Sequence, residues 1–146
     1  MKVSTKGRYG ARIMLELALH YEERLLTVKA IAEKQGISEK YIEQIISMLN
    51  KAGLVRSNRG AAGGYRLAKA PGEITLKQIL AVTEGALALV ECIAPVNPYG
   101  CPRKHECIMV DIWQDVQNRM LDAVGSLTLA DLVVRYHEKS GFSYSI

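Results

Sequence analysis

Long apolar runs are missing from this chain of 146 residues. No segment approaches the roughly 18 consecutive apolar residues that suggest a membrane-spanning helix. The first residues, MKVSTKGR, are mostly polar and basic, so they lack the apolar centre of a secretory signal peptide. From these two absences we expect a cytoplasmic protein that is neither inserted into a membrane nor secreted.

Cysteine is scarce as well. The chain has three cysteines, all within ECIAPVNPYGCPRKHEC, residues 91 to 107, and this stretch also holds three of the four prolines. An odd number of cysteines in a reducing compartment argues against a framework of disulfides and favours metal binding or redox chemistry. This segment is therefore the first candidate for a functional site.

Patterns typical of an active site are also missing. We find no Ser/His/Asp set and no catalytic arrangement of carboxylates, so the sequence does not predict an enzyme. The glycine-rich RGAAGG at residues 59 to 64 could suggest a phosphate-binding loop. Such a loop would need a Lys-Ser/Thr pair and a following helix, and this one runs into a predicted strand.

Charge is unevenly divided along the chain. Residues 1 to 85 carry 14 Lys+Arg against 8 Asp+Glu, a net charge of +6, whereas residues 86 to 146 carry 5 against 7, a net charge of −2. A basic amino-terminal part fits a polyanionic partner such as nucleic acid. A solvated basic face would give the same counts, so charge alone does not decide between them.

Hydrophobic periodicity predicts a helix-turn-helix in the first half. Residues 9 to 22 are apolar on nearly all sides, which predicts a buried helix with Ser4 or Thr5 as its cap. Two shorter helices are predicted over residues 27 to 36 and 38 to 53, each with a Thr or Ser cap and a final glycine. Their tight Gly-Ile-Ser turn is typical of a helix-turn-helix. The second of them carries an apolar stripe: Ile42, Ile45, Ile46 and Leu49.

After residue 53 the apolar pattern changes to a period of about 2, as in a strand. LVRSN (54 to 58) and YRLAK (65 to 69) predict two short strands, and the glycines between them suit a hairpin loop. A helix-turn-helix followed by a β-hairpin is a winged helix. Thr75 then caps a further predicted helix that ends near Glu84.

A long helix is predicted from about Ile108. Its apolar residues recur at spacings of three and four, which is typical of a helix that packs lengthwise on another helix. This stripe predicts a dimer interface, although it could instead fold back on its own winged helix. Thr128 to Asp131 is predicted as a capped turn that leads into a polar tail. The stripe consists of Met109, Trp113, Val116, Met120, Ala123 and Leu127.

The predicted fold is mainly α with a small β-hairpin: a winged helix-turn-helix plus a long carboxy-terminal dimerisation helix. Residues 1 to 85 form the predicted DNA-binding domain, and 86 to 107 form a cysteine-rich loop. Residues 108 to 140 form the dimerisation helix and a carboxy-terminal segment, and 141 to 146 form a tail.

The third predicted helix has a polar face opposite its apolar stripe. Glu43 differs from the others on this face, because phosphates repel a carboxylate unless it accepts a hydrogen bond, for example from cytosine. It therefore either excludes sequences without a donor or is an ordinary solvated residue. The side chains that a DNA major groove would meet there are Lys40, Glu43, Gln44 and Ser47.

The predicted hairpin and the amino terminus add cations to this surface. Arg59 lies where the hairpin turns, next to Gly60, and is placed to enter a narrow minor groove. Further cations are placed to neutralise phosphates near the start of the first helix. They are Lys2, Lys6, Arg8 and Arg12.

Six motifs spread over nearly the whole chain carry a resemblance. They are STKGRYG (4 to 10), IAEKQGIS (31 to 38), YIEQ (41 to 44), LNKAGLV (49 to 55), RGAAGGY (59 to 65) and the three-cysteine loop before a tryptophan-containing helix. In these motifs the chain resembles the Rrf-type winged-helix transcription regulators, and among them the IscR-like iron-sulfur cluster regulators.

The resemblance implies a homodimer that reads a partly palindromic operator, with YIEQ in the major groove and Arg59 in the minor groove. It also implies a 2Fe-2S cluster in the cysteine loop, supplied by the iron-sulfur assembly machinery, and control of iron-sulfur assembly genes. The DNA-binding residues that we expect are Lys6, Arg8, Ser38, Lys40, Tyr41, Glu43, Gln44, Arg59 and Gly60.

The expected cluster ligands are Cys92, Cys101 and Cys107. Thiolates suit iron-sulfur clusters and zinc, so from the residues alone a cluster, zinc and unliganded thiols all stay open. The absence of a tight C-x₂₋₄-C pair favours a two-iron cluster over structural zinc.

IscR-like loops usually have five residues in both cysteine gaps and a histidine three residues after the last cysteine. Here eight residues separate the first two cysteines, and Val110 stands at the histidine position. The fourth ligand is therefore open among Asp111, His105 and Glu106, a residue of the partner subunit, or a small thiol.

We expect a dimeric repressor or dual regulator whose cluster occupancy reports iron, sulfur and oxidant status. The alternative is a cluster-independent regulator of the same fold, acting in cysteine metabolism or in a nitric-oxide or redox response through a small ligand, zinc or a protein partner.

Overall fold

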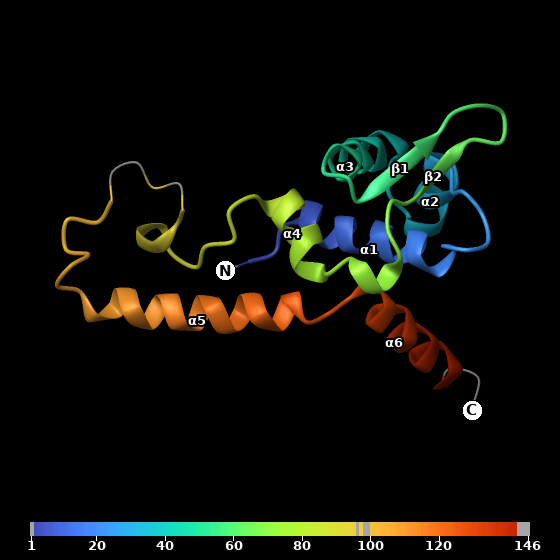
Figure 1. Cartoon of the computed structure of the whole chain (residues 1–146). Helices are drawn as coiled ribbons and strands as arrows, with labels where there is room; N and C mark the ends of the chain where they lie inside the picture. Colours follow the sequence, from blue (N-terminus) through green and yellow to red (C-terminus); the bar gives the residue numbers. More distant parts are fainter. Residues whose placement is uncertain (1, 96, 98–99, 143–146) are drawn as a thin grey trace.

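The computed structural model describes residues 2–95, 97 and 100–142. A helical body carries the β-hairpin, and α5 (Ile108–Gly125) projects from this body as an arm (Figure 1). The segment 86–107 runs along α5, where η2 (Glu91–Ile93) contacts it. The fold is mainly helical with one two-stranded sheet in the described residues, as the sequence predicts.

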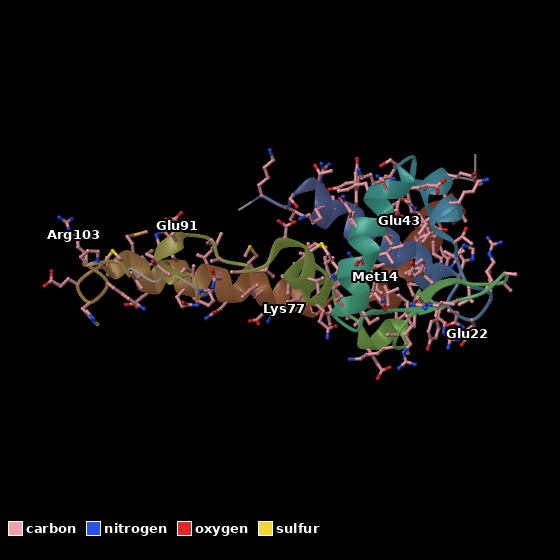
Figure 2. All side chains as sticks on the ribbon, turned by 90° about the horizontal axis from the view of Figure 1, so that it is seen from above. Met14, Glu22, Glu43, Lys77, Glu91 and Arg103 are labelled. Carbon is pink, nitrogen blue, oxygen red and sulfur yellow. The ribbon has the colours of Figure 1, made fainter. Side chains whose placement is uncertain are left out.

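Helix α1 (Thr5–Leu19) lies at the centre of the body. Ser4 caps it by accepting a hydrogen bond from the Gly7 N–H, which confirms one of the two predicted caps. The helix contacts α2, α3, α4, α6 and β2, so it is covered on several sides, as predicted from its apolar sequence. Met14 is fully buried there and lies in the middle of the body (Figure 2).

Helices α2 (Val28–Gln35) and α3 (Glu39–Lys51) form the predicted helix-turn-helix. Thr27 and Ser38 accept hydrogen bonds from backbone N–H groups of the first turns, which confirms both caps. Gly36 ends α2 with φ of 65°, a left-handed conformation that favours glycine. All four residues of the predicted α3 stripe are buried, and each contributes roughly 1.5–3 kcal/mol of hydrophobic stabilisation.

The wing consists of β1 (Val55–Asn58) and β2 (Gly64–Leu67), paired antiparallel with Val55 opposite Leu67. These two residues are buried and anchor the hairpin to the body. Leu26 adds an isolated bridge to Tyr65, with backbone hydrogen bonds of 3.0 and 2.8 Å. The predicted hairpin is confirmed, with each strand one residue shorter than expected and β2 beginning one residue earlier.

Helix α4 (Leu76–Glu84) follows the 3-10 turn η1 (Pro71–Glu73). The Thr75 hydroxyl caps α4 by accepting from the Gln78 N–H, and Gln78 Oε1 accepts from the Thr75 N–H, which completes a capping box. This cap and the start of α5 at Ile108 lie where the sequence predicts them.

Beyond the predicted capped turn the chain forms a helix that we did not predict, α6 (Leu129–Phe142), which extends into residues 141 and 142 of the predicted tail. The predicted capped turn is the beginning of this helix: Asp131 accepts hydrogen bonds from the N–H and hydroxyl of Thr128. Leu129 is fully buried, and α6 contacts α1 and η1, so packing stabilises this helix. Residues 143–146 of the predicted tail lie outside the described residues.

In the part of the chain that the structure describes, no helix combines the length and the apolar character needed to cross a membrane.

Candidate nucleic-acid interface and cysteine segment

The outer face of α3 is polar and exposed. Its predicted DNA-facing side chains make no hydrogen bond or ion pair with other described residues, so they are available to a ligand. Figure 2 shows Glu43 on this helix. The available side chains are Lys40, Glu43, Gln44 and Ser47.

Tyr41 lies at the edge of this face and is half-buried. Its ring meets that of Tyr9 edge to face, with ring centroids 5.7 Å apart and an interplanar angle of 73°. This pair joins α3 to α1. The Ser38 hydroxyl caps α3 on the Tyr41 N–H, so the first turn is fixed by a cap and by a ring contact.

The cations near the start of α1 have different surroundings. Lys6 and Arg8 are exposed, and Arg8 donates one hydrogen bond to the nearby Thr5 hydroxyl at 3.1 Å. Arg12 is exposed as well, but it donates two hydrogen bonds to Gln35 at the end of α2. From the sequence we expected Lys6, Arg8 and Arg12 alike to contact phosphates. No local pattern indicated that Arg12 would bond Gln35.

The wing tip combines an exposed cation with close backbone contacts. Arg59 is exposed, and Gly60 has φ of 117°, a conformation strained for any other residue. A Cβ at Gly63 would collide with the Asn58 carbonyl, so the turn needs glycine there as well. The hairpin can therefore present Arg59 at a turn where Gly60 and Gly63 add no side chain beside the backbone.

Two further cations on the wing were not predicted as DNA contacts. Arg56 and Arg66 are exposed and lie opposite each other in the antiparallel register. Neither makes an ion pair within the described residues. Alternation along the strands, with Val55 and Leu67 facing inward, was the signal in the sequence that places both arginines outward.

A buried carboxylate that the sequence did not single out connects α1 to α2. Glu16 is only 4% exposed and accepts a hydrogen bond from Lys34 at 2.9 Å. That bond raises the pKa of Lys34. Glu16 also contacts His20 Nε2 at 3.2 Å and Gln35 Nε2 at 3.3 Å, so it holds the end of α2 against α1.

A second unpredicted contact lies where the winged helix meets the arm. Both the backbone N–H and the hydroxyl of Ser4 donate to Glu84 Oε1, at 3.0 and 2.6 Å. Glu84 is the last residue of α4, directly before the segment 86–107. The amino terminus of α1 is therefore tied to the point where the cysteine segment begins.

The cysteine segment is attached to α5 by a buried amide. Gln117, the one α5 residue that is buried, accepts a hydrogen bond from the Leu89 N–H at 2.9 Å. Cys92 lies in η2, and Cys107 is the residue before α5. These two thiols and that of Cys101 are free and half-buried.

The chemistry of these donors suits an iron-sulfur cluster, but their arrangement does not yet form a site. Within residues 2–95, 97 and 100–142, no three His, Cys, Asp or Glu side chains are grouped so that they could hold a metal ion. The candidate fourth ligands, His105, Glu106 and Asp111, are all exposed. The structure thus places the predicted ligands on one arm without bringing them together.

The first half of α5 exposes a large apolar face. The exposed fractions of its side chains run from 36% for Trp113 to 73% for Ile108. Only the end of α5 lies against the body, where Gly125 is next to Lys77 of α4. The alternative that the stripe folds back on its own winged helix therefore fails for this half, which exposes Ile108, Met109, Ile112, Trp113 and Val116.

Comparisons with known proteins agree with this architecture. Residues 3–135 match the family model Rrf2, described as an iron-dependent transcriptional regulator. The chain is 37% identical over 134 residues to the HTH-type transcriptional regulator IscR of Aliivibrio salmonicida. These aligned residues make up 92% of this chain and 78% of that protein.

Two solved structures are similar as well. IscR of T. potens has a TM-score of 0.77 and 40% identity, over 95% of this chain and 90% of that one. CymR, the global cysteine regulator of B. subtilis, has a TM-score of 0.74 and 40% identity, over 92% of this chain and 98% of that one.

Proposed function

The chain belongs to the Rrf2 family of transcription regulators, and we propose that it binds operator DNA as a homodimer under the control of a 2Fe-2S cluster. Members of this family are regulators rather than enzymes. The observation that carries the cluster proposal is that all three thiols lie on the arm that also exposes the apolar face of α5.

Residues 1–85 are the proposed DNA-binding domain, with α3 in the major groove and the wing tip in the minor groove. The polar face of α3 supports this role, because its side chains have no partners within the described chain. Lys40 and Gln44 can bond phosphates or base edges, and Tyr41 offers a hydroxyl beside them. Arg59 enters the minor groove, where the negative potential of A·T-rich DNA attracts it.

The homodimer is proposed to form through α5 and its second copy. A helix that exposes Ile112, Trp113 and Val116 along one face leaves an apolar patch that a monomer in water seldom keeps. A two-fold symmetric contact buries this patch against itself and presents two copies of α3 to a palindromic operator.

Cys92, Cys101 and Cys107 are the proposed cluster ligands, with the fourth ligand among His105, Glu106, Asp111 or a group from outside the chain. The cluster would supply a redox-active, oxidant-sensitive centre. The described residues around the segment transmit its state: Gln117 connects it to α5, and Glu84 connects its start to α1.

Anaerobic purification with absorption and Mössbauer spectroscopy tests the cofactor. We expect a coloured protein with the spectrum of a 2Fe-2S centre, and a colourless protein when Cys92, Cys101 and Cys107 are all changed to Ala. Wild-type protein that stays colourless after reconstitution with iron and sulfide would contradict the cluster.

A cluster-independent regulator of the same fold is the second candidate. Two observations favour it: no metal-ligating group forms within the described residues, and CymR is as similar in sequence as T. potens IscR. In that case the triple cysteine variant keeps the operator choice of the wild type. An altered operator choice in the variant excludes this candidate.

A further inference from the structure

Arg12 is held within the protein by three separate contacts. Its Nε donates to Gln35 Oε1 at 2.8 Å, and its Nη2 donates to the Gln35 carbonyl at 2.9 Å. Its guanidinium carbon lies 5.4 Å from the ring centroid of Tyr9, which is cation-π distance. A side chain held by these three contacts would have to break some of them in order to reach a DNA phosphate.

The contact with Gln35 fixes the end of α2. Gln35 is the last residue of that helix, so its carbonyl has no N–H partner within the helix. Arg12 satisfies this carbonyl and places a positive charge at the negative end of the helix dipole. Glu16 holds the Gln35 side chain from the other side, at 3.3 Å, so this residue is fixed by both of its side-chain polar atoms.

The contact with Tyr9 extends to the recognition helix. Tyr9 packs edge to face on Tyr41, which belongs to the proposed DNA-reading face of α3. Only Gly36, Ile37 and the cap Ser38 separate the end of α2 from α3. Arg12 therefore touches both supports of the recognition helix, the preceding turn and the ring pair.

We propose that Arg12 is a positioning residue for operator recognition: it orients Tyr41 and the start of α3 and does not itself contact phosphate. This inference rests on the proposed DNA binding. A lysine cannot replace Arg12. Its ammonium group lacks the planar set of donors with which a guanidinium bonds two acceptors while it stacks on a ring.

The experiment compares wild type with Arg12→Ala, Arg12→Lys and, as a control cation on α1, Arg8→Ala. The probes are a DNA duplex selected from a random pool by the wild-type protein and a scrambled duplex of the same composition. Affinities for both duplexes are measured over a range of KCl concentrations. The ratio of the two affinities reports specificity, and the salt slope reports the number of phosphate contacts.

Arg12→Ala and Arg12→Lys should both lose roughly tenfold in affinity for the selected duplex, about what one charged hydrogen bond contributes. Their affinity for the scrambled duplex and their salt slopes should stay close to wild type. Arg8→Ala should weaken both duplexes alike, with a salt slope smaller by about one.

The proposal is overturned if Arg12→Ala weakens both duplexes equally with a smaller slope and Arg12→Lys restores them, since that is the behaviour of a phosphate contact. An equal loss on both duplexes with an unchanged slope also overturns it, because it indicates only a smaller folded fraction.

Gln35→Ala provides a second variant that removes the side-chain acceptor Oε1 and keeps the backbone carbonyl and every cation. It should lose specificity in the same direction as Arg12→Ala but to a smaller extent, and the double variant should lose little more than Arg12→Ala alone, because both changes break the contact between Arg12 Nε and Gln35 Oε1. If the loss of affinity for the selected duplex in the double variant equals the sum of the losses in the two single variants, the proposal is contradicted. This comparison still decides the question if Arg12→Ala alone folds poorly. If the wild type selects no duplex at all, the proposed function fails rather than this inference.

Discussion

At the scale of single residues, Glu43 carries a negative charge, as do the phosphates of its proposed ligand. It is exposed on α3 with no partner in the described chain. A carboxylate beside phosphates tolerates only those sequences that offer it a hydrogen-bond donor. In the proposed complex, operator choice therefore depends on the side chain at position 43.

We predict that Glu43→Ala admits additional operator sequences to the cluster-free protein, because the repelling carboxylate is removed. Selection from a random DNA pool followed by sequencing measures this. Glu33→Ala on α2 makes the same change of charge outside the reading face and should leave the selected set unchanged. An unchanged set for Glu43→Ala would count against its role as a gate.

Asp131 gives a prediction of pH dependence. Hydrogen bonds from the backbone and hydroxyl of Thr128 lower the pKa of this carboxyl below its ordinary value. A lowered pKa adds stability that is present above the ordinary pKa and lost as the pH falls through the lowered one. We predict that Asp131→Asn lowers the melting temperature at pH 7 and that the difference from wild type shrinks at acid pH. Asp122→Asn, an exposed control, should show no such trend.

At the scale of elements, the crossing of α1 and α4 depends on small residues. A Cβ at Gly10 would come within 2.8 Å of Thr83 Cγ2, and one at Gly7 would collide with Glu84. Thr83 is buried and bonded to the Ile79 carbonyl at 3.1 Å, so it has little room to move. The two helices can approach this closely only because glycine occupies both positions.

Gly10→Ala should therefore lower the free energy of unfolding by roughly 1–3 kcal/mol, the usual cost of overpacking, although alanine favours a helix. Urea denaturation measures this change. Gly141→Ala in α6 is the control, because this change brings the new Cβ within 4 Å of no atom of the described residues, and it should be neutral or slightly stabilising. Equal effects at the two positions would show that the α1–α4 crossing is not tight.

At the scale of the whole molecule, the proposed dimer would use the arm to bring two DNA-reading helices together. The winged helix has its own core, and the first half of α5 leaves its apolar face uncovered. A regulator that reads both halves of a palindrome needs this face to bind a second copy.

We predict that Trp113→Asp yields a monomer, because it places a charge in the centre of the apolar face. Operator affinity should fall at least roughly tenfold as the two half-sites become independent. Sedimentation velocity and a binding titration measure the two effects. Gln114→Asp, whose side chain bonds Asn118 instead of facing the stripe, is the matched control and should stay dimeric. A dimeric Trp113→Asp protein would contradict the proposed interface.

Local patterns in the sequence were sufficient to predict the helix-turn-helix, the wing and the start of α5. Caps such as Thr27 and Thr75 act within three residues, and the stripe of α3 repeats within one helix. Signals of this kind depend only on neighbours in the chain, so one sequence contains them.

Tertiary structure alone decided the rest, because the contacts involved join residues far apart in the chain. Ser4 and Glu84 are 80 positions apart, and Arg12 and Gln35 are 23 apart, so no local spacing indicates either pair. Helix α6 is stabilised by long-range packing, because Leu129 enters the core. The sequence by itself determined which chemical groups the protein carries, such as three thiols on one segment. Only packing determined which of these groups meet, because burial and long-range contacts depend on how all the helices fold together.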